Sequence, residues 1–389
     1  MEFALEKEDV EAEIEAAAEE SLIGDECSDT PFDPRNVNVF TKMQVVNLLV
    51  RRIRNGALDL HPEFQRSSGI WTNTNKSRLI ESLLIRIPIP SLYFDASDDD
   101  HWSVIDGLQR LSTIYEFVND HFKLSNLEFL HDLNGKTYSQ MGSKYQTRID
   151  ETEIASYLIM PGTPLRVKFD IFRRINTGGR PLCPQEIRHA LNNGPCTRLL
   201  QAMVETDEFK SAVCGGVSAL RMADRECALR YLAFLDQPPE DYRRSSFNLF
   251  LCEYMEKFNL AHKGHAVDDP SLRQILDRFT RTMRFASELF GKCAFRLLDK
   301  NGVPSGSRVS KALFEAWSVN LAKIDDVRQK VLLDRKDLLI RSFAERLSSD
   351  PDFCKSVTQS TGGVTSVHMR FAVVKSLIDE VSYAAKTVS

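Results

Sequence analysis

Asp106, Gly107, Gln109 and Arg110 stand together where a short apolar stretch, residues 102–105, passes into a helical pattern. At a strand-to-helix junction, exposed backbone N–H groups and the helix dipole favour an anion. Glycine lets the backbone approach a ligand closely, and arginine forms paired hydrogen bonds with phosphate oxygens. The sequence therefore predicts phosphate binding at this junction.

The carboxylate of Asp106 repels an anion, so it needs a different role at such a site. It can hold a divalent cation such as Mg²⁺, orient an arginine, or activate a water molecule. Aspartate is also one of the residues that most often cap the N-terminus of a helix, and this purely structural interpretation stays open.

Two further segments have residue types suited to phosphate. Residues 173–180 contain three arginines, two glycines, Asn176 and Thr177, and the alternation over 166–172 predicts a strand before them. The other segment is 64–66, Phe-Gln-Arg, with Trp71 five residues on. A basic surface turn explains the first segment equally well, and ordinary aromatic packing explains the second.

In their order and spacing, these motifs resemble the N-terminal domain family of GmrSD-type restriction endonucleases. The resemblance rests on the Phe-Gln-Arg segment, on IDGLQRLSTI at 105–114, on LNGK at 133–136 and on FRRINTGGRPLCPQEIR at 172–188. It continues weakly through RMADRE and RYLAF, and so spans about 36–330.

The resemblance implies a ParB/sulfiredoxin-like fold and a role in bacterial defence against phage and foreign DNA. It also implies binding and hydrolysis of a nucleoside triphosphate, with Mg²⁺ arriving with the nucleotide. The catalytic candidates carried over are Asp106, Gln109 and Arg110, with Asp106 also the metal ligand. The nucleotide-binding and phosphate-binding candidates are Gln65, Arg66, Gly107, Arg174, Asn176 and Thr177.

One position departs from the family pattern, because Leu108 stands where relatives have a first glutamine. Leucine neither donates nor accepts a hydrogen bond, so the contribution of that amide is missing. A module that binds nucleotide or DNA without hydrolysis, and regulates a separately encoded effector, is therefore an alternative to the enzyme. A DNA nickase using the same site is a third alternative. His368 is the only histidine after His265, so we expect the His-Asn-His nuclease of larger family members to be absent here.

Length and patterning predict an α+β domain followed by an all-α domain. The 389 residues divide into an acidic arm at 1–35, a nucleotide-binding domain at 36–193 and a helical domain at 194–389. A helix capped by Thr41 opens the second of these, and a hairpin joins strands at 91–94 and 102–105. Helices are predicted at 185–191, 221–235, 247–258, 271–290 and 310–322.

Charge and composition limit the binding partners and the cellular compartment that we expect for the chain. Residues 1–30 hold twelve acidic residues and one lysine, so a chain of net charge −5 has a body of about +6 that can bind a polyanion. The eight cysteines form no CxxC pair, which argues against a structural zinc site. With no membrane-length apolar run and no secretion signal, we expect a cytoplasmic protein with no membrane partner.

Overall fold

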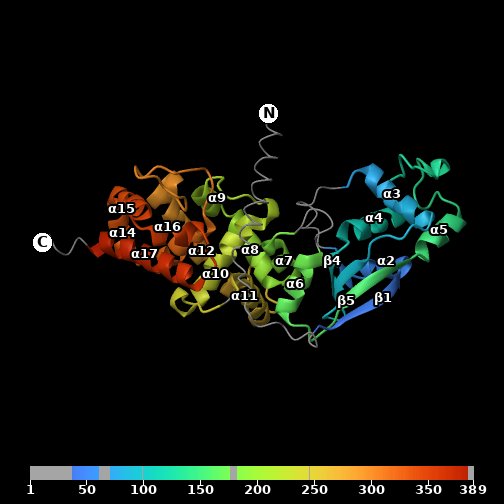
Figure 1. Ribbon diagram of the computed structural model, residues 1–389, viewed down its shortest axis with the longest axis horizontal. Coiled ribbons are helices and arrows are strands. Elements are labelled where there is room, and N and C mark those ends of the chain that lie inside the picture. The colour runs from blue at the N-terminus through green and yellow to red at the C-terminus, as the bar shows by residue number, and fades with distance from the viewer. Residues whose placement is uncertain (1–36, 61–70, 99, 176–181, 245, 384–389) are drawn as a thin grey trace. The chain divides into compact units, whose positions relative to one another are not determined.

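A computed structural model describes residues 37–60, 71–98, 100–175, 182–244 and 246–383 (Figure 1). The chain forms two compact units, one within 32–182 and the other from 183 onward. The first unit combines a sheet with helices, whereas the second is built from helices. A mixed α+β architecture with a helical part was predicted and is confirmed.

The first unit is organised around a mixed five-stranded sheet with the order β1-β5-β3-β4-β2. Neighbouring strands pair antiparallel in β1·β5 and β3·β4, and parallel in β3·β5 and β2·β4. The strands are β1 (Val39–Val45), β2 (Leu58–Asp59), β3 (Leu92–Asp95), β4 (Trp102–Asp106) and β5 (Glu153–Ile159).

Helix α3 (Asn73–Leu84) packs against α4 (Leu108–Val118) and α5 (Ser143–Asp150) beside this sheet (Figure 1). The buried apolar side chains of α3 and α4 recur at three- and four-residue spacing, as an amphipathic helix requires. They join the inward side chains of the strands in one core. This core fixes the start of α4, where the predicted site lies.

The predicted hairpin is confirmed, since β3 and β4 pair antiparallel. The prediction that Thr41 caps a helix is wrong about where the helix begins. Residues 39–45 form β1 along β5, and helix α2 (Val46–Arg54) begins only after Val45 without a side-chain cap. Backbone hydrogen bonds to a strand more than a hundred residues away override the local helix signal.

The predicted strand at 166–172 is also wrong, because this segment forms helix α6 (Leu165–Ile175). Val167 and Phe169 are two residues apart, which gave the strand-like alternation. Phe169 and Phe172 are three apart and both buried, which is the spacing of one helix face. A short apolar pattern of this kind fits either structure until its burial is known.

The second unit contains helices with a shared core of aromatic and aliphatic side chains, including the buried Trp317. The predicted helices starting near 185, 221, 247, 271 and 310 are all confirmed. The α-helices described here are α7 (Pro184–Leu191), α8 (Pro195–Glu205), α9 (Asp207–Val213), α10 (Ala223–Asp236), α11 (Phe247–Ala261), α12 (Pro270–Phe290), α13 (Lys311–Leu321), α14 (Asp326–Asp334), α15 (Lys336–Ser349), α16 (Pro351–Thr358) and α17 (Val364–Tyr383). Among the described residues, none of the helices is both long and apolar enough to cross a bilayer.

Candidate functional site

The junction between β4 and α4 is built as the sequence predicts. Strand β4 ends at Asp106, Gly107 adopts the left-handed conformation with φ of +96°, and α4 begins at Leu108. Gly107 is the N-cap residue and contributes no side-chain hydrogen bond. Asp106 is therefore the last residue of the strand rather than the cap, and its carboxylate is available for another purpose.

Arg110 is turned inward onto the protein. Its Nη2 donates to Oδ2 of Asp106 at 2.7 Å, and its Nη1 donates to the carbonyl oxygens of Pro90 and Ser91, at 3.2 Å for Ser91. The Arg110 side chain is 12% exposed, against 33% for Asp106. Of the three roles considered for Asp106, the geometry shows the one in which carboxylate and arginine hold each other.

The space beside Gly107 is filled by the protein itself. A Cβ atom at this position would lie 2.2 Å from Cδ2 of Leu92 and 3.4 Å from Nη2 of Arg110. The Cβ side of Gly107 is thus occupied by the protein, and the approach of a ligand to the backbone of Gly107 stays a prediction. Its lack of a side chain instead lets β3 and the arginine close over the junction.

A stacked tyrosine pair lies next to this junction and was not foreseen. The rings of Tyr93 and Tyr157 are 4.7 Å apart and 13° from parallel, and Tyr93 pairs with Asp106 across the sheet. Burial, Tyr157 and Asp106 raise the pKa of Tyr93, while Arg110 opposes them. Tyr93 therefore stays a protonated hydrogen-bond donor near neutral pH. In the structure, the burial of the side chains alternates along β5.

Of the other predicted site residues, the structure describes some and not others. Gln109 is half-buried in the first turn of α4, and Arg174 is exposed near the end of α6. Gln65, Arg66, Asn176 and Thr177 lie outside the described residues. The structure thus brings together Asp106, Gly107, Gln109 and Arg110. Because Arg66 lies outside the described residues, a common phosphate site formed by Arg66, Arg110 and Arg174 stays a prediction.

The donor set at the junction does not form a metal centre of its own. In the described ranges, no three His, Cys, Asp or Glu side chains are grouped so that they could hold a metal ion. Mg²⁺ often binds through one or two carboxylates together with substrate phosphates and water. The single carboxylate of Asp106 could therefore bind Mg²⁺ only together with substrate phosphates and water, and not as part of a metal site made by the protein alone.

Comparison with known families identifies one match in the first half of the chain. Residues 46–192 match the family of the GmrSD restriction endonuclease, N-terminal domain. The match includes the β4–α4 junction and all the other predicted site residues, and it ends just after α7. No curated protein and no solved structure matches the chain.

Proposed function

We propose, from the match of residues 46–192 to the GmrSD restriction endonuclease N-terminal domain family, that the chain is a nucleotide-binding component of a restriction-type defence system. Hydrolysis of a nucleoside triphosphate is the activity that we assign to the β4–α4 junction. A ParB/sulfiredoxin-like arrangement of the first unit is part of the proposal, and the mixed sheet with its α4 junction is compatible with it.

The observation that carries the proposal is the fixed pair of Asp106 and Arg110. A carboxylate that is one-third exposed and held at 2.7 Å by a mostly buried arginine is pre-oriented toward solvent. Such a group can position an attacking water next to a bound phosphate, with Gln109 beside it in the first turn of α4. Arg110 is a positioning residue in this scheme, because its guanidinium donates to protein oxygens.

Contact with the phosphates then falls to the other predicted residues. Arg174 is exposed on α6 and offers a guanidinium that can fork onto phosphate oxygens. Gln65, Arg66, Asn176 and Thr177 complete the proposed set. The Mg²⁺ that accompanies the nucleotide would take Asp106 as its protein ligand and would neutralise charge on the phosphates.

A second candidate function is nucleotide binding without hydrolysis, in the service of a separate effector protein. The observation that favours it is Leu108, which is half-buried and packs against the core of the first unit. At this position the chain has an apolar core contact in place of an amide. A leucine here preserves the junction and removes a hydrogen-bonding group.

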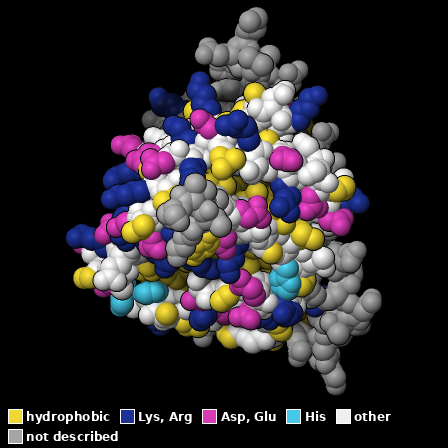
Figure 2. All heavy atoms as spheres, turned by 90° about the vertical axis from the view of Figure 1, so that its left-hand side faces the viewer, with side chains coloured by type: hydrophobic (Ala, Val, Ile, Leu, Met, Phe, Trp, Pro, Cys, Tyr) yellow, Lys and Arg dark blue, Asp and Glu magenta, His cyan; other side chains and the backbone are white. Residues whose placement is uncertain are grey.

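Direct action on DNA has less support. On the face shown in Figure 2, Lys and Arg side chains are interspersed with Asp and Glu. Proteins that bind the DNA backbone strongly gather several Lys and Arg side chains against the phosphates. We therefore keep DNA as a partner of the system and nicking as an outcome to be tested.

The test measures phosphate release from ATP, GTP, CTP and UTP with Mg²⁺, and nucleotide binding by calorimetry, on the same preparations. The variants are Asp106→Asn, Arg110→Gln and Leu108→Gln. Asp132→Asn is the matched control, because Asp132 is an exposed aspartate of the same unit. We expect Asp106→Asn to lower the turnover by at least 100-fold with binding retained, and the control to leave both unchanged.

Other outcomes separate the alternatives. Binding without hydrolysis in the wild type, with hydrolysis gained by Leu108→Gln, supports the regulatory module. Nicking of supercoiled plasmid that is lost in Asp106→Asn supports the nickase. Absence of both binding and hydrolysis for all four nucleotides rejects the proposed function.

A further inference from the structure

The sheet of the first unit has one face packed on the core and one face that is partly open. Phe94 of β3 and Leu158 of β5 point to the packed face, where they share a core with α3 and α4. Tyr93 and Tyr157, which precede them in the chain, point the other way and are only half-buried. The partly open face is therefore a surface on which polar side chains can meet a ligand.

A β-bulge places Asp106 on this partly open face. Phe94 of β3 pairs with Val104 of β4, so a regular antiparallel ladder would set Tyr93 opposite Ile105. The register shifts at this point, and Tyr93 pairs with Asp106 instead. Bulges occur often beside functional sites, where the extra residue re-aims a side chain. Here the bulge aligns the carboxylate of Asp106 with the tyrosine of the neighbouring strand.

Asp106, Tyr93, Tyr157 and Thr41 form one polar row across four strands. Tyr93 is the register partner of both Asp106 and Tyr157, and Tyr157 is also the partner of Thr41. Register partners on neighbouring strands share a face of the sheet. Since neighbouring strands lie about 4.8 Å apart, the row extends over about 14 Å. It has a carboxylate at one end and hydroxyl groups along the rest.

The two tyrosine rings stand side by side in this row. Their centroids are 4.7 Å apart and their planes are 13° from parallel, so each ring covers one face of the other. Among the described residues, neither hydroxyl group has a hydrogen-bond partner. Burial, Tyr157 and Asp106 raise the pKa of Tyr93 and Arg110 lowers it, so the Tyr93 hydroxyl lies within electrostatic reach of the Asp106–Arg110 pair.

The chemistry of the row fits a chain of phosphates. A carboxylate repels an anion, so phosphates that extend away from Asp106 need hydrogen-bond donors along their path. A phenol hydroxyl donates to a phosphate oxygen, and a half-buried hydroxyl without a protein partner gains a bond that it otherwise lacks. Donors spread along a row, rather than gathered at one point, suit an extended ligand. The linked phosphates of a nucleoside triphosphate meet these conditions.

We propose that Tyr93 and Tyr157 bind the phosphates of the nucleotide, with the terminal phosphate beside Asp106 and the remainder directed along the row toward Thr41. This inference rests on the nucleotide binding proposed for the β4–α4 junction, and it holds with or without hydrolysis. The tyrosines add neutral donors to the guanidinium groups proposed above. They also set the direction in which the nucleotide lies on the sheet.

The test compares Tyr93→Phe, Tyr157→Phe and the double variant in the full chain, because phenylalanine keeps the stacked rings and removes only the hydroxyl groups. The matched control is Tyr145→Phe. Tyr145 is also half-buried in the first unit, but it lies on α5, which packs against α3. Calorimetry with Mg²⁺ measures the binding of ATP, GTP, CTP and UTP, and phosphate release gives kcat and KM. Circular dichroism melting verifies that each variant is folded.

We expect each single variant to weaken nucleotide binding about fivefold, the effect of one neutral hydrogen bond, and the double variant to weaken it more than either. The control should bind as the wild type does. Where the wild type hydrolyses the nucleotide, KM should rise and kcat should stay within about twofold, because these bonds form in the bound substrate and the transition state alike. Asp106→Asn should show the opposite division between KM and kcat.

Two outcomes overturn the inference, and they differ in what they leave standing. Unchanged nucleotide binding in the double variant, or an equal loss in Tyr145→Phe, overturns the role of the tyrosines and leaves the proposed function intact. Absence of binding by the wild type for all four nucleotides rejects the proposed function and the role of the tyrosines together.

Discussion

Arg370 on α17 and Glu315 on α13 are both fully buried, and the arginine Nε donates to the glutamate Oε1 at 2.8 Å. The same guanidinium donates to the carbonyl oxygens of Ser356 and Thr361, at 3.3 and 2.6 Å. One side chain therefore links α13, the end of α16 and the loop that follows it. This pair stabilises the packing of α17 against α13.

Removing the charge of Glu315 should destabilise the helical unit strongly. In Glu315→Gln, Arg370 and Arg230 keep their charges without the carboxylate, and breaking a buried pair in this way costs about 3–5 kcal/mol. The fluorescence of Trp317 during urea unfolding, in a background with Trp71 and Trp102 changed to Phe, reports on this unit alone.

Asp236→Asn is the control for that experiment. Asp236 pairs with Lys257, and their side chains are 49% and 74% exposed, so the change should cost less than about 1 kcal/mol. Equal effects of the two substitutions would contradict the stabilising role given to the buried pair of Arg370 and Glu315.

Glu81 should make the first unit sensitive to acid. Burial raises the pKa of Glu81, but hydrogen bonds from the backbone N–H groups of Glu128, Leu130 and Phe129 outweigh it and lower the pKa below its usual 4.5. A carboxylate whose pKa is lower in the folded state stabilises that state fully above pH 4.5. This stabilisation is lost as the pH falls through the folded-state value.

We therefore expect Glu81→Gln to lower the free energy of unfolding by about 2 kcal/mol at pH 7, with the difference shrinking below pH 4.5. Denaturant unfolding at pH 7, 5 and 3.5 measures this. Glu128→Gln is the control, because Glu128 is about half exposed in its pair with Arg78. A difference that stays constant across the pH range would refute the assignment.

Gly107→Ala should reveal how tightly the junction is closed. The left-handed conformation alone costs alanine about 1–2 kcal/mol, and the contact with Leu92 adds about 1–3 kcal/mol of overpacking. Gly56→Ala separates the two effects, because Gly56 has φ of +70° and no atom within 4 Å of an added Cβ. Thermal melting of both variants, and of Gly107→Ala combined with Leu92→Ala, gives the comparison. The double variant should recover part of the loss, and no recovery would place the strain elsewhere.

Cysteine labelling should be selective. Burial raises the pKa of Cys227 and Cys252 to about 12 each, and these thiols are inaccessible. Cys214 is exposed at the end of α9. Among the described cysteines, iodoacetamide at pH 8 should modify Cys214 first, as peptide mass spectrometry can show. Modification of Cys227 before Cys214 would indicate that the helical unit opens readily.

The sequence predicted the helices well and the sheet incompletely. Helices such as α12 and α13 follow from apolar spacing within one segment. Strands β1 and β5 depend on each other across more than a hundred residues, so neither segment reveals its partner. The buried Ser156 in the middle of β5 further weakens the apolar alternation of that strand.

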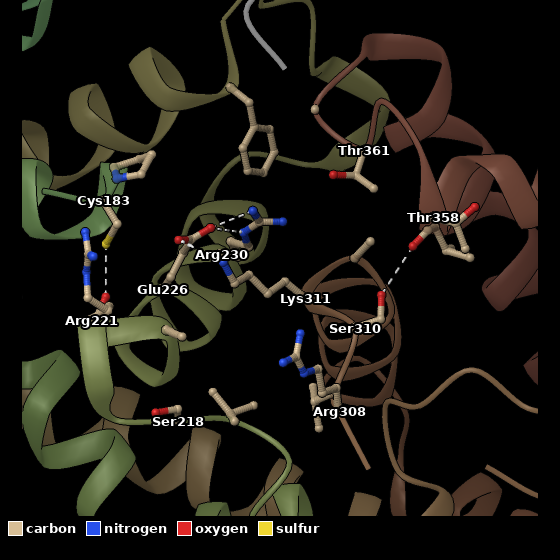
Figure 3. Close-up of a pocket in the computed structure, with 18 of the residues that line it drawn as sticks. Cys183, Ser218, Arg221, Glu226, Arg230, Arg308, Ser310, Lys311, Thr358 and Thr361 are labelled. Atoms are coloured by element: carbon tan, nitrogen blue, oxygen red, sulfur yellow. Dashed lines mark hydrogen bonds and ion pairs between the residues drawn. The ribbon is translucent and has the colours of Figure 1, made fainter. Parts of the chain in front are cut away.

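The candidate site likewise has some features that local sequence predicts and others that depend on distant residues. The strand, glycine and helix at 102–118 were predicted from local sequence and are confirmed. The inward turn of Arg110 depends on carbonyl groups of Pro90 and Ser91, about twenty residues earlier, and no local pattern predicts it. A cavity of about 360 Å³ in the helical unit (Figure 3) was not predicted, because its lining residues come from stretches between 183 and 362 that show no common motif.

The 55-residue separation between Glu315 and Arg370 along the chain has a consequence for biosynthesis. Domains generally fold as units during translation, with N-terminal parts first. Glu315 leaves the ribosome before α17 does, and until that helix docks it lacks its closest cation. The helical unit therefore completes its core only after α17 has been synthesised, and a product truncated before α17 is a natural target for chaperones and proteases.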